Sequence, residues 1–162
     1  MRVLEIMTGT PYRCRPECNL GAATELMWIG NCGFLPVVTE DAKVVGVITD
    51  RDICVALGTR GQPAGEVAVA EVMSRNVYFC APEDDVRTAL RTMCEARVRR
   101  LPVVAQDGTL VGVLSIDEVL QRAELRQLGR VPEISSDEVI RTLQSINAHQ
   151  LPPPVAAQRA AA

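Results

Sequence analysis

The sequence predicts a mixed α and β protein made of two β-α-β-β-α units and a C-terminal helix. Residues 5–56 align without a gap on residues 71–122, and roughly a third of these positions are identical. Short runs rich in Val and Ile alternate in each copy with apolar residues at helical spacing, and the same strand-to-helix junction occurs twice. A repeat of this length indicates a duplicated structural unit.

The junction is the strongest local feature of each copy. In the first copy, the apolar run 44–48 predicts a strand, and apolar residues at 53, 56 and 57 predict a helix directly after it. Thr49 and Asp52 would then lie beside free backbone N–H groups and the positive end of a helix dipole, a favourable position for a phosphorylated ligand. Ser115 and Glu118 are the equivalent pair in the second copy.

The other elements follow in the same order in both copies. A short strand at 12–14 (78–80) should precede a helix that Asn19 caps in the first copy and Asp84 or Asp85 in the second. A strand at 35–39 (101–105), a turn and the return strand come next. Both strands are almost wholly apolar, so both faces of the small sheet should be covered. A sheet of this size cannot bury that surface alone, so the two units should pack together.

Glycine and proline mark the boundaries. Residues 58–65 contain three glycines and a proline, which predict a linker between a unit at 1–62 and a unit at 66–126. A helix that begins at Glu118 should end near Leu128, just inside the remaining segment, 127–162. The Ser135-x-x-Glu138 capping box should open another helix. Three prolines at 152–154 should stop this helix, and the Ala-rich end beyond them is expected to be disordered.

Composition excludes several classes of function. The net charge of −3 and the pI near 5.2 give no general attraction to nucleic acid or to anionic membranes. No apolar run approaches the roughly 20 residues that cross a bilayer, and the N-terminal residues lack a signal-peptide core. We therefore expect a cytoplasmic protein. The sequence shows no catalytic triad or Walker-type loop, so we expect no enzymatic activity.

The cysteines predict buried, reduced thiols rather than a metal site. Six cysteines show no CxxC pair, and the single histidine, His149, lies far from them in the sequence. We expect no bound metal. A redox sensor that uses Cys14 and Cys18 remains an alternative.

The repeated Leu-Pro-Val-Val strand, at 35–38 and 101–104, and the repeated Gly-Val-[Ile/Leu]-[Thr/Ser] junction resemble a tandem pair of CBS domains, often called a Bateman module. The resemblance covers about residues 3–125. It implies pseudo-twofold packing through the sheets and two clefts that bind an adenine nucleotide of the AMP, ADP or ATP class. It also implies a regulatory, energy-sensing homodimer that signals in trans to a partner protein and requires no cofactor.

The resemblance also assigns roles to particular residues. Thr49 would bond phosphate or ribose, Asp52 would accept from the ribose hydroxyls, and basic residues would meet phosphate. Each assignment has an alternative. The two junction pairs would only cap helices, and the arginines would be solvated surface side chains. The whole protein would then be a dimeric scaffold with empty clefts that docks a partner through its 136–148 helix. The candidate site residues are Thr49, Asp52, Arg51, Arg99, Arg100, Ser115, Glu118, and Tyr12 and Tyr78 at the edges of the base.

Overall fold

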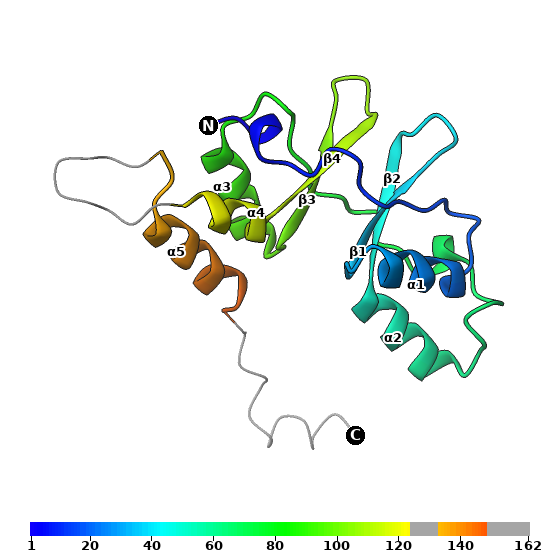
Figure 1. Ribbon diagram of the computed structural model, residues 1–162. Coiled ribbons are helices and arrows are strands. Elements are labelled where there is room, and N and C mark those ends of the chain that lie inside the picture. Colours follow the sequence, from blue (N-terminus) through cyan, green and yellow to red (C-terminus); the bar gives the residue numbers. More distant parts are fainter. Residues whose placement is uncertain (124–132, 149–162) are drawn as a thin grey trace, which may run out of the picture.

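The computed structural model describes residues 1–123 and 133–148, and it shows two similar halves and a C-terminal helix (Figure 1). The expected mixed fold with a duplicated unit is confirmed. The first half contains α1 (Leu20–Ile29), β1 (Phe34–Val38), β2 (Val44–Thr49) and α2 (Asp50–Arg60). The second contains α3 (Val86–Ala96), β3 (Arg100–Val104), β4 (Leu110–Ser115) and α4 (Ile116–Arg122). The C-terminal helix is α5 (Ser136–Ile146), and single 3-10 turns, η1 (Val3–Glu5) and η2 (Val69–Glu71), precede the halves.

Each half is built on an antiparallel hairpin, β1–β2 or β3–β4. The expected preceding strands, at 12–14 and 78–80, are reduced to single parallel bridges, Cys14 to Val37 and Cys80 to Val103. Proline explains the difference. Extending the first bridge would require N–H donors from Pro16 and Pro36, which proline lacks, and Pro82 and Pro102 occupy the equivalent positions in the second half.

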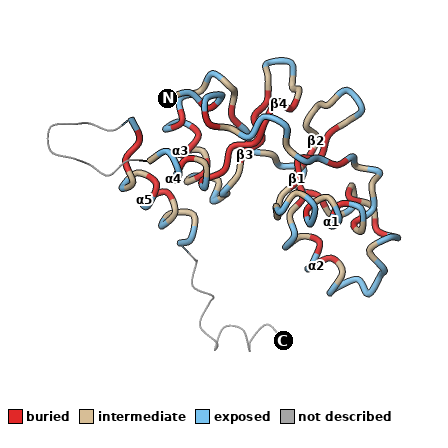
Figure 2. The backbone as a smooth tube through the Cα atoms, viewed as in Figure 1, coloured by how far each residue is buried: buried red, intermediate tan, exposed pale blue. Residues whose placement is uncertain are grey.

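The segment before each unit packs on the other half of the molecule. Val3 and Ile6 lie in the buried core of the second half, while Val69 and Met73 lie in the core of the first. Figure 2 shows a separate set of buried residues in each half. Because the repeat places both segments identically in sequence, it could not show which half each one covers. The boundaries at 62 and 66 describe the sequence repeat and stay a prediction.

The repeated junction glycine is needed for this exchange. Thr8 bridges to Val113 and Ser74 bridges to Val47, so a crossing segment runs along each hairpin. A Cβ added at Gly112 would lie 2.9 Å from the Thr8 carbonyl oxygen, and one added at Gly46 would lie 3.0 Å from that of Ser74. The first distance is too short for a real Cβ and the second is very tight, so a side chain at either position would displace the crossing segment.

The tips of the two hairpins join the halves by reciprocal contacts. The Val44 N–H donates to the Gly108 carbonyl (3.2 Å), and the Leu110 N–H donates to the Ala42 carbonyl (2.9 Å). Each bond is the repeat equivalent of the other, as pseudo-twofold packing requires. Lys43 adds an ion pair with Asp107 (2.8 Å), and this hydrogen-bonded contact lowers the pKa of the Asp107 carboxyl.

Helix α5 covers α3 and α4 of the second half (Figure 1). Its expected capping box is present, since the Ser135 N–H donates to Glu138 (2.8 Å) and the Glu138 N–H to the Ser135 hydroxyl (3.3 Å). Val139 is fully buried in the core of the second half. Helix α4 ends at Arg122, earlier than expected, because Ala123 is extended. The expected helix end near 128 and the Pro/Ala-rich tail lie outside the described residues.

Candidate functional site

A cleft of about 710 Å³ lies between the two halves and beside the end of α5. This volume falls within the range of small-molecule sites. The cleft receives the first junction from one side and the segment that leads into β3 from the other. Its lining residues are Gly33, Phe34, Val47, Thr49, Asp50, Arg51, Asp52, Ser74, Asn76, Tyr78, Arg97, Val98, Arg99, Arg100, Pro102, Ile146 and Asn147.

Thr49 and Asp52 both cap α2 and line the cleft. The Thr49 N–H (2.9 Å) and hydroxyl (2.6 Å) donate to Oδ2 of Asp52, and the Asp52 N–H donates to the Thr49 hydroxyl (3.2 Å). The capping alternative therefore describes these contacts correctly. It does not remove the pair from the cleft, since both side chains are half-buried there. Within the described part of the chain, Oδ1 of Asp52 has no hydrogen-bond partner, so this oxygen can accept from a ligand.

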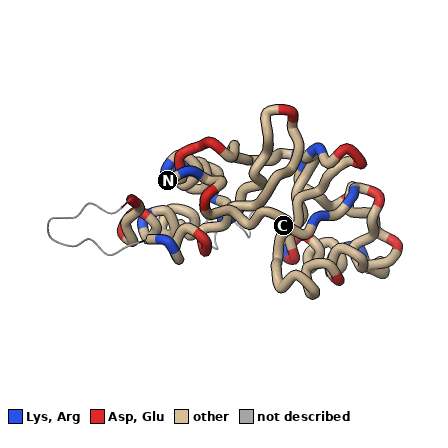
Figure 3. The backbone as a smooth tube through the Cα atoms, turned by 45° about the horizontal axis from the view of Figure 1, so that its top comes forward, with Lys and Arg blue, Asp and Glu red and all other residues tan. Residues whose placement is uncertain are grey.

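Four arginines give the cleft a basic wall, and Figure 3 marks the basic positions in blue. Arg51 comes from α2, and the other three come from the segment 97–100 of the second half. Arg97 ends α3 in the left-handed conformation, with φ of 54°. Arg100 faces Asp117 at 3.7 Å, and because Asp117 is well exposed this pair contributes little. Among the described residues that line the cleft, four are arginines and two, Asp50 and Asp52, are acidic, so this lining is net positive.

The two tyrosine candidates, Tyr12 and Tyr78, lie in different parts of the structure. Tyr78 lines the cleft, and its hydroxyl accepts a hydrogen bond from Nδ2 of Asn76 (3.3 Å). Tyr12 instead packs over the C-terminal end of α1, where a Cβ added at Gly30 would come within 2.6 Å of its ring. The described structure thus places Tyr78 on the wall of this cleft and Tyr12 away from it.

The second junction pair is engaged elsewhere and does not line this cleft. Ser115 is buried, and Glu118 accepts from the Ser115 N–H (2.5 Å) and, through its other oxygen, from the Thr8 hydroxyl (2.7 Å). The extra methylene of Glu118 relative to Asp52 lets it reach the crossing segment. Both carboxylate oxygens are therefore occupied.

Sequence reasoning missed several lining residues. Phe34, at the start of β1, offers an aromatic face, and Arg97 adds a further cation. The cluster of three arginines in four residues was visible in the sequence and could have implicated Arg97. Asn147 had no such signal, because its place on the cleft depends on how α5 packs against the second half.

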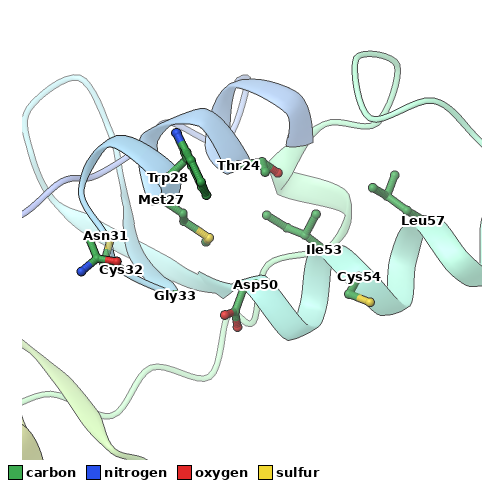
Figure 4. Close-up of a pocket in the computed structure, with 10 residues that line it drawn as sticks. All are labelled: Thr24, Met27, Trp28, Asn31, Cys32, Gly33, Asp50, Ile53, Cys54 and Leu57. Carbon is green, nitrogen blue, oxygen red and sulfur yellow. The ribbon is translucent and has the colours of Figure 1, made fainter.

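A second groove, of about 560 Å³, runs between α1 and α2 (Figure 4). It is mainly apolar, with Met27, Ile53 and Leu57 among its walls, and Trp28 at its edge is 86% exposed. Cys32 and Cys54 also contribute to it. Across residues 1–123 and 133–148, no cluster of three or more potential metal-ligating side chains occurs.

The buried cysteines are poorly suited to redox chemistry. Burial raises the pKa of the Cys14 thiol to about 12, and the same effect raises the pKa of Cys80 to about 12. Because the thiolate is the reactive form, this burial disfavours the alternative of a sensor built on Cys14 and Cys18. In the segments that the structure describes, no helix has the length and apolar character needed to span a bilayer.

Two fused, pseudosymmetric units with a ligand-sized cleft between them define a tandem-domain module. A family model described as the CBS domain matches residues 3–59 and 69–124, and the chain belongs to this family. The resemblance found in the sequence is thereby confirmed.

Relatives share this pair in different contexts. The CBS domain-containing protein YhcV of Bacillus subtilis is 32% identical over 117 residues, which cover 72% of this chain and 81% of that protein. The inosine-5′-monophosphate dehydrogenase of Methanocaldococcus jannaschii is 34% identical over 127 residues, or 78% of this chain and 24% of the enzyme. The chain spans 57%, 45% and 24% of the length of three of the curated relatives that it matches.

Solved structures agree with the fold. The CBS domain pair of protein MJ0100, solved with 5′-methylthioadenosine and S-adenosyl-L-methionine, is 25% identical with a TM-score of 0.68, over 75% of this chain and 94% of that one. CBSX2 in complex with AMP is 26% identical, with a TM-score of 0.65, over 74% of this chain and 93% of that one. The CBS domain protein TA0289 of Thermoplasma acidophilum, 21% identical, matches 93% of this chain and 78% of its own with a TM-score of 0.74.

Proposed function

We propose that this CBS pair is a regulatory module that binds an adenine nucleotide, of the AMP, ADP or ATP class, in the cleft between its halves. The observation that carries the proposal is that a carboxylate and guanidinium groups line the same cleft from opposite halves. Asp52 brings a free carboxylate oxygen from the first half, and Arg99 and Arg100 bring guanidinium groups from the second. A carboxylate suits the ribose hydroxyls, and guanidinium groups suit phosphate.

The lining also distinguishes among adenosine ligands. MJ0100 was solved with ligands that carry no phosphate, and CBSX2 with one that carries a phosphate. The net positive wall of the present cleft favours the second kind. Phe34 and Val47 provide apolar surface for a base, and Tyr78 lies beside them on the cleft wall.

A titration series tests this proposal. AMP, ADP, ATP, adenosine, 5′-methylthioadenosine and GMP would be titrated into the protein by calorimetry at fixed salt concentration. We expect an adenine nucleotide to bind at least tenfold more tightly than adenosine, because one charge-assisted phosphate contact contributes about that much. Equal affinity for adenosine and AMP would contradict the phosphate assignment. No binding by any of these ligands would contradict nucleotide sensing and favour the scaffold.

We further propose that the α1–α2 face joins two copies into the homodimer that the family resemblance implies, and that the dimer signals to a partner protein. The equivalent face of the second half is covered by α5, whereas Trp28 (86%), Ile29 (60%) and Val55 (52%) stay exposed on the first. Trp28→Glu should convert a dimer to a monomer by light scattering, with Arg13→Glu, an exposed residue outside the helices, as the control. An unchanged mass for Trp28→Glu would refute this interface.

A further inference from the structure

The C-terminal end of α5 forms part of the cleft wall, although α5 lies outside the repeated unit. Ile146 and Asn147 line the cleft together with Arg99. Nη2 of Arg99 donates a hydrogen bond to Oδ1 of Asn147. We propose that Asn147 is a positioning residue for Arg99, and that α5 thereby sets the affinity of the cleft for a phosphorylated ligand. This inference rests on the proposed nucleotide function.

The Asn147 amide is itself held in place by α5. Its Nδ2 donates to the Leu143 carbonyl (2.8 Å), and its backbone N–H donates to the same oxygen (3.0 Å). With the amide nitrogen occupied, Oδ1 is left to accept from Arg99. Leu143 packs against the buried core of the second half, so the orientation of the amide follows from the packing of α5.

Arg99 gains most from such support. It is exposed on the short segment between α3 and β3, and a free arginine side chain there would sample many rotamers. Ordering it before the ligand arrives reduces the entropy lost on binding. A guanidinium group has five N–H donors, so the bond to Asn147 leaves four for phosphate.

The neutrality of Asn147 matters as much as its position. An amide orients the guanidinium group without cancelling its charge. Arg100 differs, because the carboxylate of Asp117 lies 3.7 Å from it. Asn147 therefore holds Arg99 without placing a negative charge beside it.

The position of α5 is fixed independently of the cleft. Val139 is buried, and Glu138 pairs with Arg87 at 2.7 Å. Both residues lie near the start of α5, at the opposite end of the helix from Asn147. Coupling between sites is reciprocal, so a phosphate that engages Arg99 should also hold the end of α5 more firmly. Within the described structure, this contact gives the bound state a route to a helix outside the CBS pair.

The experiment compares AMP with adenosine, which lacks the phosphate. Calorimetry would be carried out on the wild type, Asn147→Ala, Arg99→Ala and the double variant, with Gln144→Ala as an exposed control on the same helix. We expect Asn147→Ala to weaken AMP binding about three- to tenfold, the effect of ordering one long side chain, and to leave adenosine binding unchanged. The double variant should bind AMP no more weakly than Arg99→Ala alone, because Asn147 acts through Arg99.

A charge variant provides a second measurement. Asn147→Asp keeps an oxygen acceptor for Arg99 but adds a negative charge, so it should weaken AMP binding more than Asn147→Ala does. Thermal unfolding of each variant shows whether α5 still packs. If the wild type binds AMP and Asn147→Ala binds it equally well, or if the two variants are additive, the positioning role is wrong while the nucleotide function stands. If the wild type binds no nucleotide, both proposals fail together.

Discussion

Asp52 is the residue at which binding and stability can be separated. Its Oδ2 closes the capping box of α2 by accepting from the N–H and the hydroxyl of Thr49, while Oδ1 has no partner within the described residues. Asp52→Ala removes both oxygens, whereas Asp52→Asn keeps one oxygen acceptor and removes the charge. The two variants should therefore differ in folding stability and resemble each other in nucleotide binding.

The expected magnitudes follow from these contacts. Losing the bond from the Thr49 N–H to Asp52, the N3 residue of the capping box, should lower the free energy of unfolding by about 0.5–1.5 kcal/mol in Asp52→Ala. Losing the acceptor for the ribose should lower the binding free energy by about 1–3 kcal/mol, or roughly 5- to 150-fold in Kd. Asp52→Asn should show most of the binding loss and less of the stability loss, because an amide oxygen can still accept from the Thr49 N–H.

The internal repeat supplies the matched control. Glu118→Ala removes the equivalent box from α4, and Glu118 does not line the cleft beside Asp52. Urea denaturation would measure stability, and AMP titration would measure binding. We expect Glu118→Ala to lose stability and to keep its AMP affinity. Undiminished AMP affinity in Asp52→Ala would refute the site assignment, and equal loss in both variants would show that the binding defect only reflects a weakened fold.

Two further predictions follow from the shifted pKa values. The hydrogen bond from Arg87 lowers the pKa of Glu138 to about 2, so the stability that this carboxylate adds is present above its ordinary value of 4.5 and is lost as the pH falls towards 2. Urea denaturation between pH 6 and pH 2.5 should show a smaller acid-induced loss in Arg87→Ala than in the wild type, and parallel curves would exclude the pair as a cause. Iodoacetamide at neutral pH should modify the exposed Cys54 well before the buried Cys14 and Cys80, as mass spectrometry would show, and equally fast modification of all three would contradict their burial.

The sequence predicts the fold well where the information is local. The helix starts at Asn19 and Ser135 depend on nearby capping residues, and both are observed. The strands of each hairpin are continuous apolar runs of suitable length. The short strands at 12–14 and 78–80 were overestimated because their failure depends on which N–H groups face the neighbouring strand. That pairing, and thus the effect of the prolines, is visible only once the hairpin is placed.

The same distinction between local signals and tertiary packing applies to the candidate site residues. Thr49, Asp52 and the arginines were identified because a motif and a charge cluster mark them. Tyr12 and Tyr78 occupy equivalent positions in the repeat, but only Tyr78 lines this cleft, because the crossing segment before it runs beside the first junction whereas the one before Tyr12 runs beside the second. Asn147 joins the cleft from α5, which has no counterpart in the repeat. A repeat cannot predict how a single added helix makes its two copies differ.

Within residues 1–123 and 133–148, the two junctions differ: the first lines the cleft, and the second contacts the crossing segment instead. Glu118 reaches the Thr8 hydroxyl and occupies both of its oxygens, whereas the shorter Asp52 leaves one oxygen free. Asn147 orients an arginine on the side where that oxygen is free. A one-methylene difference and a helix outside the repeat thus favour the same cleft, and a nucleotide bound there would contact the first half, the second half and α5 together. A ligand that contacts all three parts can change how they are held relative to one another, as a regulatory module requires.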